Sequence, residues 1–172
     1  MKTILLNIVL FLSIGSADSY AQFIHLQINI ETEMRADVIE ELDFGTVIIN
    51  SGLRQIDRGD PNMGVFQLRA LKNQTLLVTL NNPEQLTHSN LNVPDLVPVN
   101  LEAAYNNTGT QSANNAVPFV NNQASFKLIG TDANDPSNQW EFAYIFIYGG
   151  ITVGNITPGM YTGTLVIEVE YL

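Results

Sequence analysis

The chain has 172 residues, no cysteine and a formal net charge of −10 at pH 7, from 17 acidic and 7 basic residues. The lack of cysteine excludes disulfides, cysteine-ligated zinc and thiol catalysis. Because nucleic acids and anionic membranes are bound by clustered Lys and Arg, the acidic balance argues against both as partners. Only 14% of the residues are charged, so the surface relies on Asn, Thr, Gln and Ser, a composition that favours strands and turns.

The first 21 residues have the features of a secretory signal peptide. A lysine follows the initial methionine, residues 4–14 form an apolar run, and Ser19 and Ala21 place small residues where a signal peptidase cleaves. The run is shorter than the ~20 residues of a membrane span. We expect residues 1–21 to be removed and residues 22–172 to form one domain, exported to the periplasm, cell surface or medium without membrane insertion. A buried N-terminal helix is the alternative.

The segment that opens this domain alternates between apolar and polar residues, which is typical of a strand with one buried face. Such a strand can pair within its own domain, or it can be added to the sheet edge of another copy. Both possibilities stay open from the sequence. The apolar residues, and so the candidate strand-addition interface, are Ile24, Leu26, Ile28 and Ile30.

Three further strands are expected in the first half of the domain. Residues 39–49 form the first, with a kink or bulge at Gly45. Residues 66–70 and 76–80 alternate clearly, and the short turn at Lys72-Asn73 between them predicts an antiparallel pair.

Two more strands are expected in the second half. Residues 96–104 form one, and Pro94 and Pro98 favour a sheet edge for it because proline has no N–H group to donate. Residues 125–129 form the other, after a loop of Asn, Thr, Gly and Ser that carries no apolar pattern.

Residues 140–147 are apolar on both faces of the expected strand, which Gly149-Gly150 should end. One face is aliphatic, and we expect a second element to cover it or another molecule to contact it. The other face carries five rings, which favour a sandwich core over a surface that stacks on sugars. The aromatic row is Trp140, Phe142, Tyr144, Phe146 and Tyr148.

The last segment contains a turn and a final strand. Pro158-Gly159 predicts a type II turn, because proline pre-sets the first turn position and glycine allows positive φ at the next. Tyr161 follows, and its hydroxyl could clamp this corner, as tyrosine corners do in β-sandwiches. Gly163 would leave room for a neighbouring chain or a large side chain. About eight strands separated by Gly, Pro and Asn turns predict an all-β antiparallel sandwich.

An early Asp-Phe-Gly-Thr element, at residues 43–46, is followed near the end of the chain by a Gly-Gly strand, a Pro-Gly turn and a Tyr-x-Gly-Thr run at residues 161–164. The order and spacing of these motifs resemble a bacterial group, domain-of-unknown-function family 4402. The resemblance implies an exported immunoglobulin-like sandwich, broadly similar to spore-coat U and fimbrial subunits, and it implies no activity. We expect the matching residues to hold the fold rather than to carry chemistry. They are Asp43, Phe44, Gly45 and Thr46 near the start, and Gly149, Gly150, Pro158, Gly159, Tyr161, Gly163 and Thr164 near the end.

Catalytic signatures are lacking in the sequence. The only histidines, His25 and His88, are accompanied by no Gly-x-Ser-x-Gly or His-Glu-x-x-His motif. We therefore expect a protein that is not an enzyme and needs no cofactor.

Two pairs of aspartates lie in turn-like segments, where Asp usually caps backbone amides. They are Asp57 with Asp60 and Asp132 with Asp135. Asp132 and Asp135, together with Asn134, could also hold calcium through oxygen ligands, but Pro136 occupies a position where an EF-hand loop needs a ligand. Arg58-Gly59-Asp60 spells an integrin-binding tripeptide, but so short a match arises by chance, and we expect an ordinary turn and no metal site.

The expected function is a non-catalytic structural or adhesive role at the cell surface or envelope. Strand addition would assemble the domain as a subunit of a pilus-like fibre or coat, with other copies or other proteins as partners. The alternative is a soluble extracytoplasmic module that binds carbohydrate or peptide.

Overall fold

Antiparallel strands make up the regular secondary structure of residues 34–129 and 139–172, which are the residues that the computed structural model describes. They all belong to the compact unit Thr32–Leu172. Within them no helix is present, so the expected all-β fold is confirmed. Several predictions fall outside the described residues: the signal peptide, the row Ile24, Leu26, Ile28 and Ile30, the histidine His25, and the aspartates Asp132 and Asp135.

Eleven strands are present in the described residues, against about eight expected. The additional strands are short, and a two-residue strand has no alternation that a sequence pattern could reveal. The strands are β1 (Arg35–Glu40), β2 (Gly52–Ile56), β3 (Gly64–Leu71), β4 (Thr75–Asn81), β5 (Gln85–His88), β6 (Leu96–Asn106), β7 (Val117–Pro118), β8 (Gln123–Lys127), β9 (Trp140–Val153), β10 (Tyr161–Thr162) and β11 (Val166–Tyr171).

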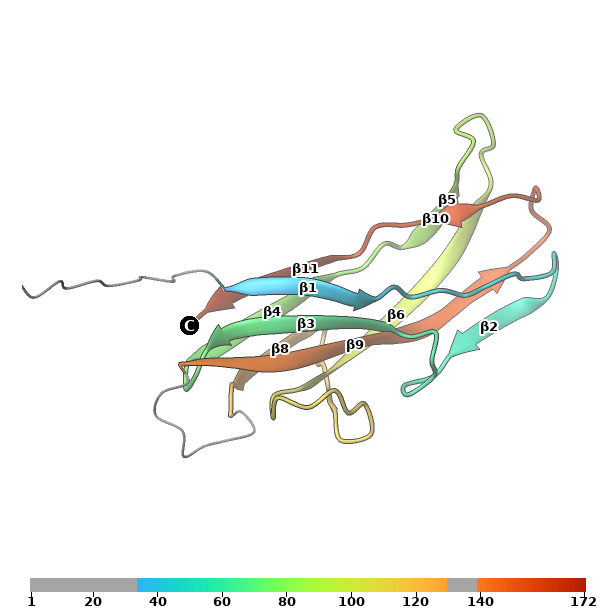
Figure 1. Cartoon of the computed structure of the whole chain (residues 1–172). Helices are drawn as coiled ribbons and strands as arrows, with labels where there is room; N and C mark the ends of the chain where they lie inside the picture. Colours follow the sequence, from blue (N-terminus) through green and yellow to red (C-terminus); the bar gives the residue numbers. More distant parts are fainter. Residues whose placement is uncertain (1–33, 130–138) are drawn as a thin grey trace, which may run out of the picture. The chain divides into compact units, whose positions relative to one another are not determined.

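The strands form two sheets that pack as a sandwich (Figure 1). The larger sheet has eight strands in the order β1-β3-β9-β6-β5-β10, with β2 also pairing with β9 and β7 with β6. The smaller sheet has the order β11-β4-β8. We call the face of the larger sheet that packs on the smaller sheet its inner face, and the opposite face its outer face.

The core lies between the inner face and the smaller sheet. Leu68 and Ile145 come from the larger sheet, and Leu76, Val78 and Phe126 come from the smaller one. Leu68, Leu76, Val78 and Phe126 alternate along their strands with more exposed residues, as a half-buried sheet requires. Full burial of one such side chain contributes about 1.5–3 kcal/mol, so these side chains hold the two sheets together.

The expected antiparallel pair of residues 66–70 and 76–80 is wrong, although both strands exist. β3 pairs with β1 and β9, whereas β4 pairs with β11 and β8 in the other sheet. The turn at Lys72-Asn73 carries the chain across the core, and Lys72 N–H donates to the Gln139 carbonyl oxygen (2.8 Å) instead of closing a hairpin. Alternation identifies a buried face, but it does not distinguish a partner beside a strand from a partner that faces it.

The strand that begins at Trp140 is longer than expected and its faces are reversed. β9 continues through Gly149-Gly150 for 14 residues. Its aliphatic residues, such as Ala143 and Ile145, face the core, and the aromatic row lies on the outer face. Phe146 is fully buried there because loop residues, including Met63 and Ala116, cover it.

The first described strand lies earlier than the sequence pattern placed it. β1 spans Arg35–Glu40, and residues 41–48 have no strand structure. Leu42 and Phe44 still point inward on either side of the exposed Asp43. The predicted alternation is therefore confirmed, whereas the predicted strand is wrong. Gly45, where a kink in this strand was expected, lies outside any strand and has φ +68°.

β6 is an internal strand, not an edge strand as its prolines suggested. It pairs with β9 on one side and with β5 and β7 on the other. Pro98 is tolerated because the pairing with β9 begins only at Val99. Between β5 and β7, the side-chain amide of Asn82 donates to the Leu101 carbonyl oxygen (3.1 Å) and substitutes for a neighbouring strand.

Candidate functional site

The turn after β9 and the end of β5 form a hydrogen-bonded corner. The Tyr161 hydroxyl donates to the Thr157 carbonyl oxygen (2.8 Å), which is the clamp expected from the sequence. Burial, with the negative charge of Asp95, raises the pKa of Tyr161, so the hydroxyl keeps its proton and remains a donor.

His88 lies at the centre of this corner, where it is the last residue of β5 and is buried. Its Nδ1 accepts a hydrogen bond from the backbone N–H of Asn90 (2.9 Å), so Nε2 carries the proton and faces the Pro158 carbonyl oxygen (3.3 Å). Its ring packs edge-on against Tyr161, with centroids 4.9 Å apart. With both ring nitrogens occupied by backbone groups, His88 supports the corner and is not arranged as a catalytic base.

Asp95 ties the same corner to the loop before β6. One carboxylate oxygen accepts from the Thr157 backbone N–H (2.7 Å) and from the Thr157 hydroxyl (2.6 Å). These hydrogen bonds hold the pKa of Asp95 below its ordinary value of 3.8. This contact could not be predicted from the sequence, because Asp95 and Thr157 are far apart along the chain.

The turn at Pro158-Gly159 is not the expected type II turn, since Gly159 does not have a positive φ. Glycine is required there for space: a Cβ atom would collide with the His88 ring. At Gly163 a Cβ atom would lie 2.8 Å from the Leu86 side chain, so the expectation that this glycine makes room for a neighbour is confirmed. Thr164, the next motif residue, is exposed.

The Asp-Phe-Gly-Thr element is a turn that places an aromatic ring in the core. The Asp43 carboxylate accepts from the Gly45 backbone N–H (2.8 Å), and Gly45 adopts the positive φ that glycine tolerates best. Phe44, between them, packs against the core between the two sheets and against the outer-face cluster around Phe146. It also packs against a third buried cluster, formed by Val97, Ile151 and Val153, while Thr46 is exposed. The element therefore joins the parts of the core, as expected of residues that hold the fold.

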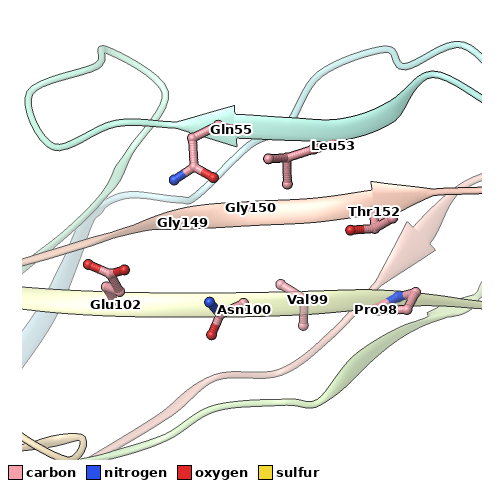
Figure 2. Close-up of a pocket in the computed structure, with 9 residues that line it drawn as sticks. All are labelled: Leu53, Gln55, Pro98, Val99, Asn100, Glu102, Gly149, Gly150 and Thr152. Atoms are coloured by element: carbon pink, nitrogen blue, oxygen red, sulfur yellow. The ribbon is translucent and has the colours of Figure 1, made fainter.

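Gly149 and Gly150 form the floor of a trough on the outer face (Figure 2). At Gly149, with φ +141°, a Cβ atom would collide with the Asn100 carbonyl oxygen. At Gly150 it would lie 3.1 Å from the Leu53 side chain and 2.5 Å from Gln55 Oε1. The two glycines therefore let β2 and β6 approach β9 closely.

The walls of the trough come from the two strands beside β9. β2 contributes Leu53 and Gln55, and β6 contributes Asn100 and Glu102 (Figure 2). The cavity has a volume of about 280 Å³. These residues share one face by register, because Gln55 and Asn100 both lie opposite Gly150. The sequence does not single out any of these four residues. They lie on two strands, β2 and β6, that are brought together only by pairing with β9.

Tyr148 occupies the next outer-face position of β9 and lies opposite Glu102. Burial and the negative charge of Glu102 raise the pKa of Tyr148, and the positive charge of Arg58 opposes them. Arg58 itself is fixed, because its guanidinium donates to the Ala116 carbonyl oxygen (2.9 Å).

The loop with the Arg-Gly-Asp tripeptide is an ordinary turn, as expected. Besides the contact of Arg58, the Asp60 carboxylate accepts from the Asn62 backbone N–H (2.8 Å). Asp60 therefore caps a turn, which is the role expected of it, while its pair Asp57 accepts through its carbonyl from Asp60 N–H (3.0 Å). No group of three or more acidic, His or Cys side chains able to hold a metal is found among the described residues.

A second candidate site is the flank of the sandwich where β1 and β11 are the outermost strands. β11 lies near β3, as the hydrogen bond from the Leu71 N–H to the Tyr171 hydroxyl (3.1 Å) shows. The opposite flank is closed by the stacked rings of Tyr105 and Phe126, whose centroids are 4.1 Å apart. We call the residues Val38, Phe66, Ile167 and Val169 the open flank. Phe66, Ile167 and Val169 pack against the core but are only half-buried, and Val38 is 57% exposed.

Comparison of the sequence with models of known protein families and with curated proteins gives no match. The resemblance to family 4402 thus stays a prediction that depends on the motif residues alone. Among the described residues, no helix is long and apolar enough to cross a membrane.

Proposed function

We propose that this protein is an exported, non-catalytic structural or adhesive domain of the cell envelope, and that it assembles by accepting a strand from another copy at the open flank. The observation that carries the proposal is the exposure of Val38. It lies opposite Phe66 on the inner face of the sheet, where an aliphatic side chain would normally be covered.

The edge of β1 supports the same proposal. β1 pairs with β3 alone within the described residues, and all six of its residues are exposed. The backbone groups along its other edge are thus a template for a further strand. Proteins usually block exposed edges with charge, proline or a covering segment. The charged residues of β1, Arg35, Asp37 and Glu40, lie opposite outer-face positions of β3 and leave the inward side of the strand apolar.

The proposed occupant is the segment around Ile24–Ile30 of a second copy. Its apolar side chains recur at every second position, which is the spacing needed to fill one side of an added strand. Covering Val38, Phe66, Ile167 and Val169 would remove their remaining apolar surface from water, and buried apolar area stabilises by about 25 cal/mol per Å².

The proposal is tested by changing the donor segment and measuring the mass of the mature chain, residues 22–172, by light scattering. Ile28→Asn should abolish concentration-dependent oligomers, whereas Gln27→Asn, on the polar side of the same segment, should leave them unchanged. Circular dichroism before each run would show that both variants are folded. Oligomers that persist in folded Ile28→Asn, or a wild-type chain that is monomeric throughout, would reject assembly through this segment.

A further inference from the structure

The trough above Gly150 has the properties of a small-molecule site that assembly does not use. It lies on the outer face of β2, β9 and β6, whereas the open flank is formed by β1 and β11 (Figures 1 and 2). Its volume of about 280 Å³ is close to the lower end of the range for ligand sites, which begins near 300 Å³. A single ring of small-molecule size would fit it.

Glycine at position 150 makes room for the Gln55 carboxamide in the trough. A side chain at position 150 would fill the space now occupied by the Gln55 carboxamide, which extends over the floor toward β6 (Figure 2). The close approach of β2 and β6 at this point thus leaves a depression bordered by side chains from both strands.

The lining is rich in groups that both donate and accept hydrogen bonds. Gln55 and Asn100 supply carboxamides, Thr152 supplies a hydroxyl, and Glu102 supplies a carboxylate. The side chains of Gln55, Asn100 and Thr152 are exposed, and none makes a hydrogen bond to another described residue, so their polar groups can serve a ligand.

The same lining disfavours other ligand classes. It holds no Lys, Arg or His, and a chain of net charge −10 repels anions. A divalent cation would find only one carboxylate, Glu102, whereas calcium takes six to eight oxygen ligands. An apolar molecule would leave two carboxamides without partners, which costs free energy.

We propose that this trough binds a neutral saccharide. Each sugar hydroxyl group can both donate and accept a hydrogen bond, as can the carboxamides of Gln55 and Asn100 on opposite walls. The Glu102 carboxylate adds a further acceptor. Leu53, which is 69% exposed, forms an apolar rim for the C–H face of a sugar ring. Tyr148 lies at the adjacent outer-face position and extends the site along β9.

Nuclear magnetic resonance on the ¹⁵N-labelled mature chain tests this assignment. The probes are glucose, galactose, mannose and N-acetylglucosamine, each titrated separately. At least one should shift the backbone amide signals of Gly149, Gly150 and Thr152 in a saturable way, with Kd in the range of about 1–10 mM for so open a site. The double variant Gln55→Ala/Asn100→Ala should weaken this binding roughly tenfold or more, because two or more hydrogen bonds are lost.

Gln85→Ala is the matched control, since Gln85 is an exposed glutamine on β5 outside the trough. It should leave the affinity unchanged. The proposal is overturned if none of the four sugars gives a saturable shift, or if the double variant binds as the wild type does. It is also overturned if a neutral tetrapeptide, and no sugar, shifts these signals, because the trough would then be a peptide site. The titration needs no oligomer, so its outcome is independent of the proposed assembly.

Discussion

Val38 of β1 lies opposite Phe66 of β3 on the inner face of the larger sheet, and yet 57% of Val38 is exposed to solvent. In a closed sandwich both side chains would be covered by the smaller sheet. Here the smaller sheet ends at β11, whose inward residues Ile167 and Val169 are themselves only half-buried. The core is therefore incomplete along one side within the described residues.

Replacing Val38 by lysine should weaken assembly without unfolding the domain. A charge at an inward position of an edge strand opposes the addition of an apolar strand, so we expect the association constant from light scattering to fall roughly tenfold or more. The control is Val117→Lys on β7, a valine that is 49% exposed on a different strand. The free energy of unfolding of both variants should lie within about 0.5 kcal/mol of the wild-type value. Equal association of the two variants would argue against the open flank as the interface.

Tyr161→Phe tests the clamp at the corner after β9. The variant loses the hydrogen bond to the Thr157 carbonyl oxygen and should lower the free energy of unfolding by about 0.5–1.5 kcal/mol in urea titrations. Tyr105→Phe is the comparison, because the Tyr105 ring stacks on Phe126 and its hydroxyl has no hydrogen-bond partner among the described residues. If the two variants lose equal stability, the hydroxyl of Tyr161 does not act as a clamp.

Asp95 should make stability depend on pH in the acid range. Its pKa in the folded protein is lowered by the two hydrogen bonds from Thr157, so the folded state favours the ionised carboxylate. The stabilisation is present above the ordinary value of 3.8 and is lost as the pH falls through the lowered pKa. The difference in unfolding free energy between wild type and Asp95→Asn should thus be largest near neutral pH and shrink below pH 3.8. A difference that is constant or grows on acidification would exclude this contact as the cause.

Gly149→Ala should be among the most damaging single changes in β9. The Cβ atom would collide with the Asn100 carbonyl oxygen and would lie 2.9 Å from the Leu101 Cα atom. The φ of +141° is also unfavourable for alanine. We expect a loss of roughly 3 kcal/mol or more in denaturant unfolding. Gly154→Ala has nothing within 4 Å of its Cβ atom and should change stability by less than about 1 kcal/mol. Similar losses for both would mean that the close approach of β6 to β9 is not required.

Lys72 and Glu141 form an ion pair at one end of the core, with Nζ and Oε1 3.8 Å apart and side chains 12% and 5% exposed. Lys72→Met would leave the Glu141 carboxylate buried without this counter-charge, and should cost about 3–5 kcal/mol. The double variant Lys72→Met/Glu141→Leu removes both charges and should recover part of that loss. A double variant that is less stable than the single one would show that the ion pair is not what stabilises this end of the sandwich.

Much of the fold was predictable because burial alternates along the strands. Leu68 and Leu76 face the core as their patterns indicated, and the sandwich class follows from many short strands. What the pattern could not decide was which strands are neighbours. β3 and β4 carry equally clear alternation and lie in different sheets, since alternation records a buried face and not a hydrogen-bonded partner.

The candidate sites were less predictable, for the same reason. Tyr161 could be placed from the turn before it, because its hydrogen bond spans four residues. The trough depends instead on Gln55, Asn100 and Gly150, which meet only through the pairing of three strands, and glycines that pack strands closely are hard to distinguish in sequence from glycines that end a strand.

The central claim is tested most directly by light scattering on residues 22–172 beside a shortened chain that starts at Glu33. Assembly through the open flank predicts that the longer chain forms concentration-dependent oligomers. It also predicts that the shortened chain is a folded monomer that binds a peptide of residues 22–32. A longer chain that is monomeric at every concentration, with a shortened chain that unfolds, would contradict the claim and place the segment in the sandwich of its own chain.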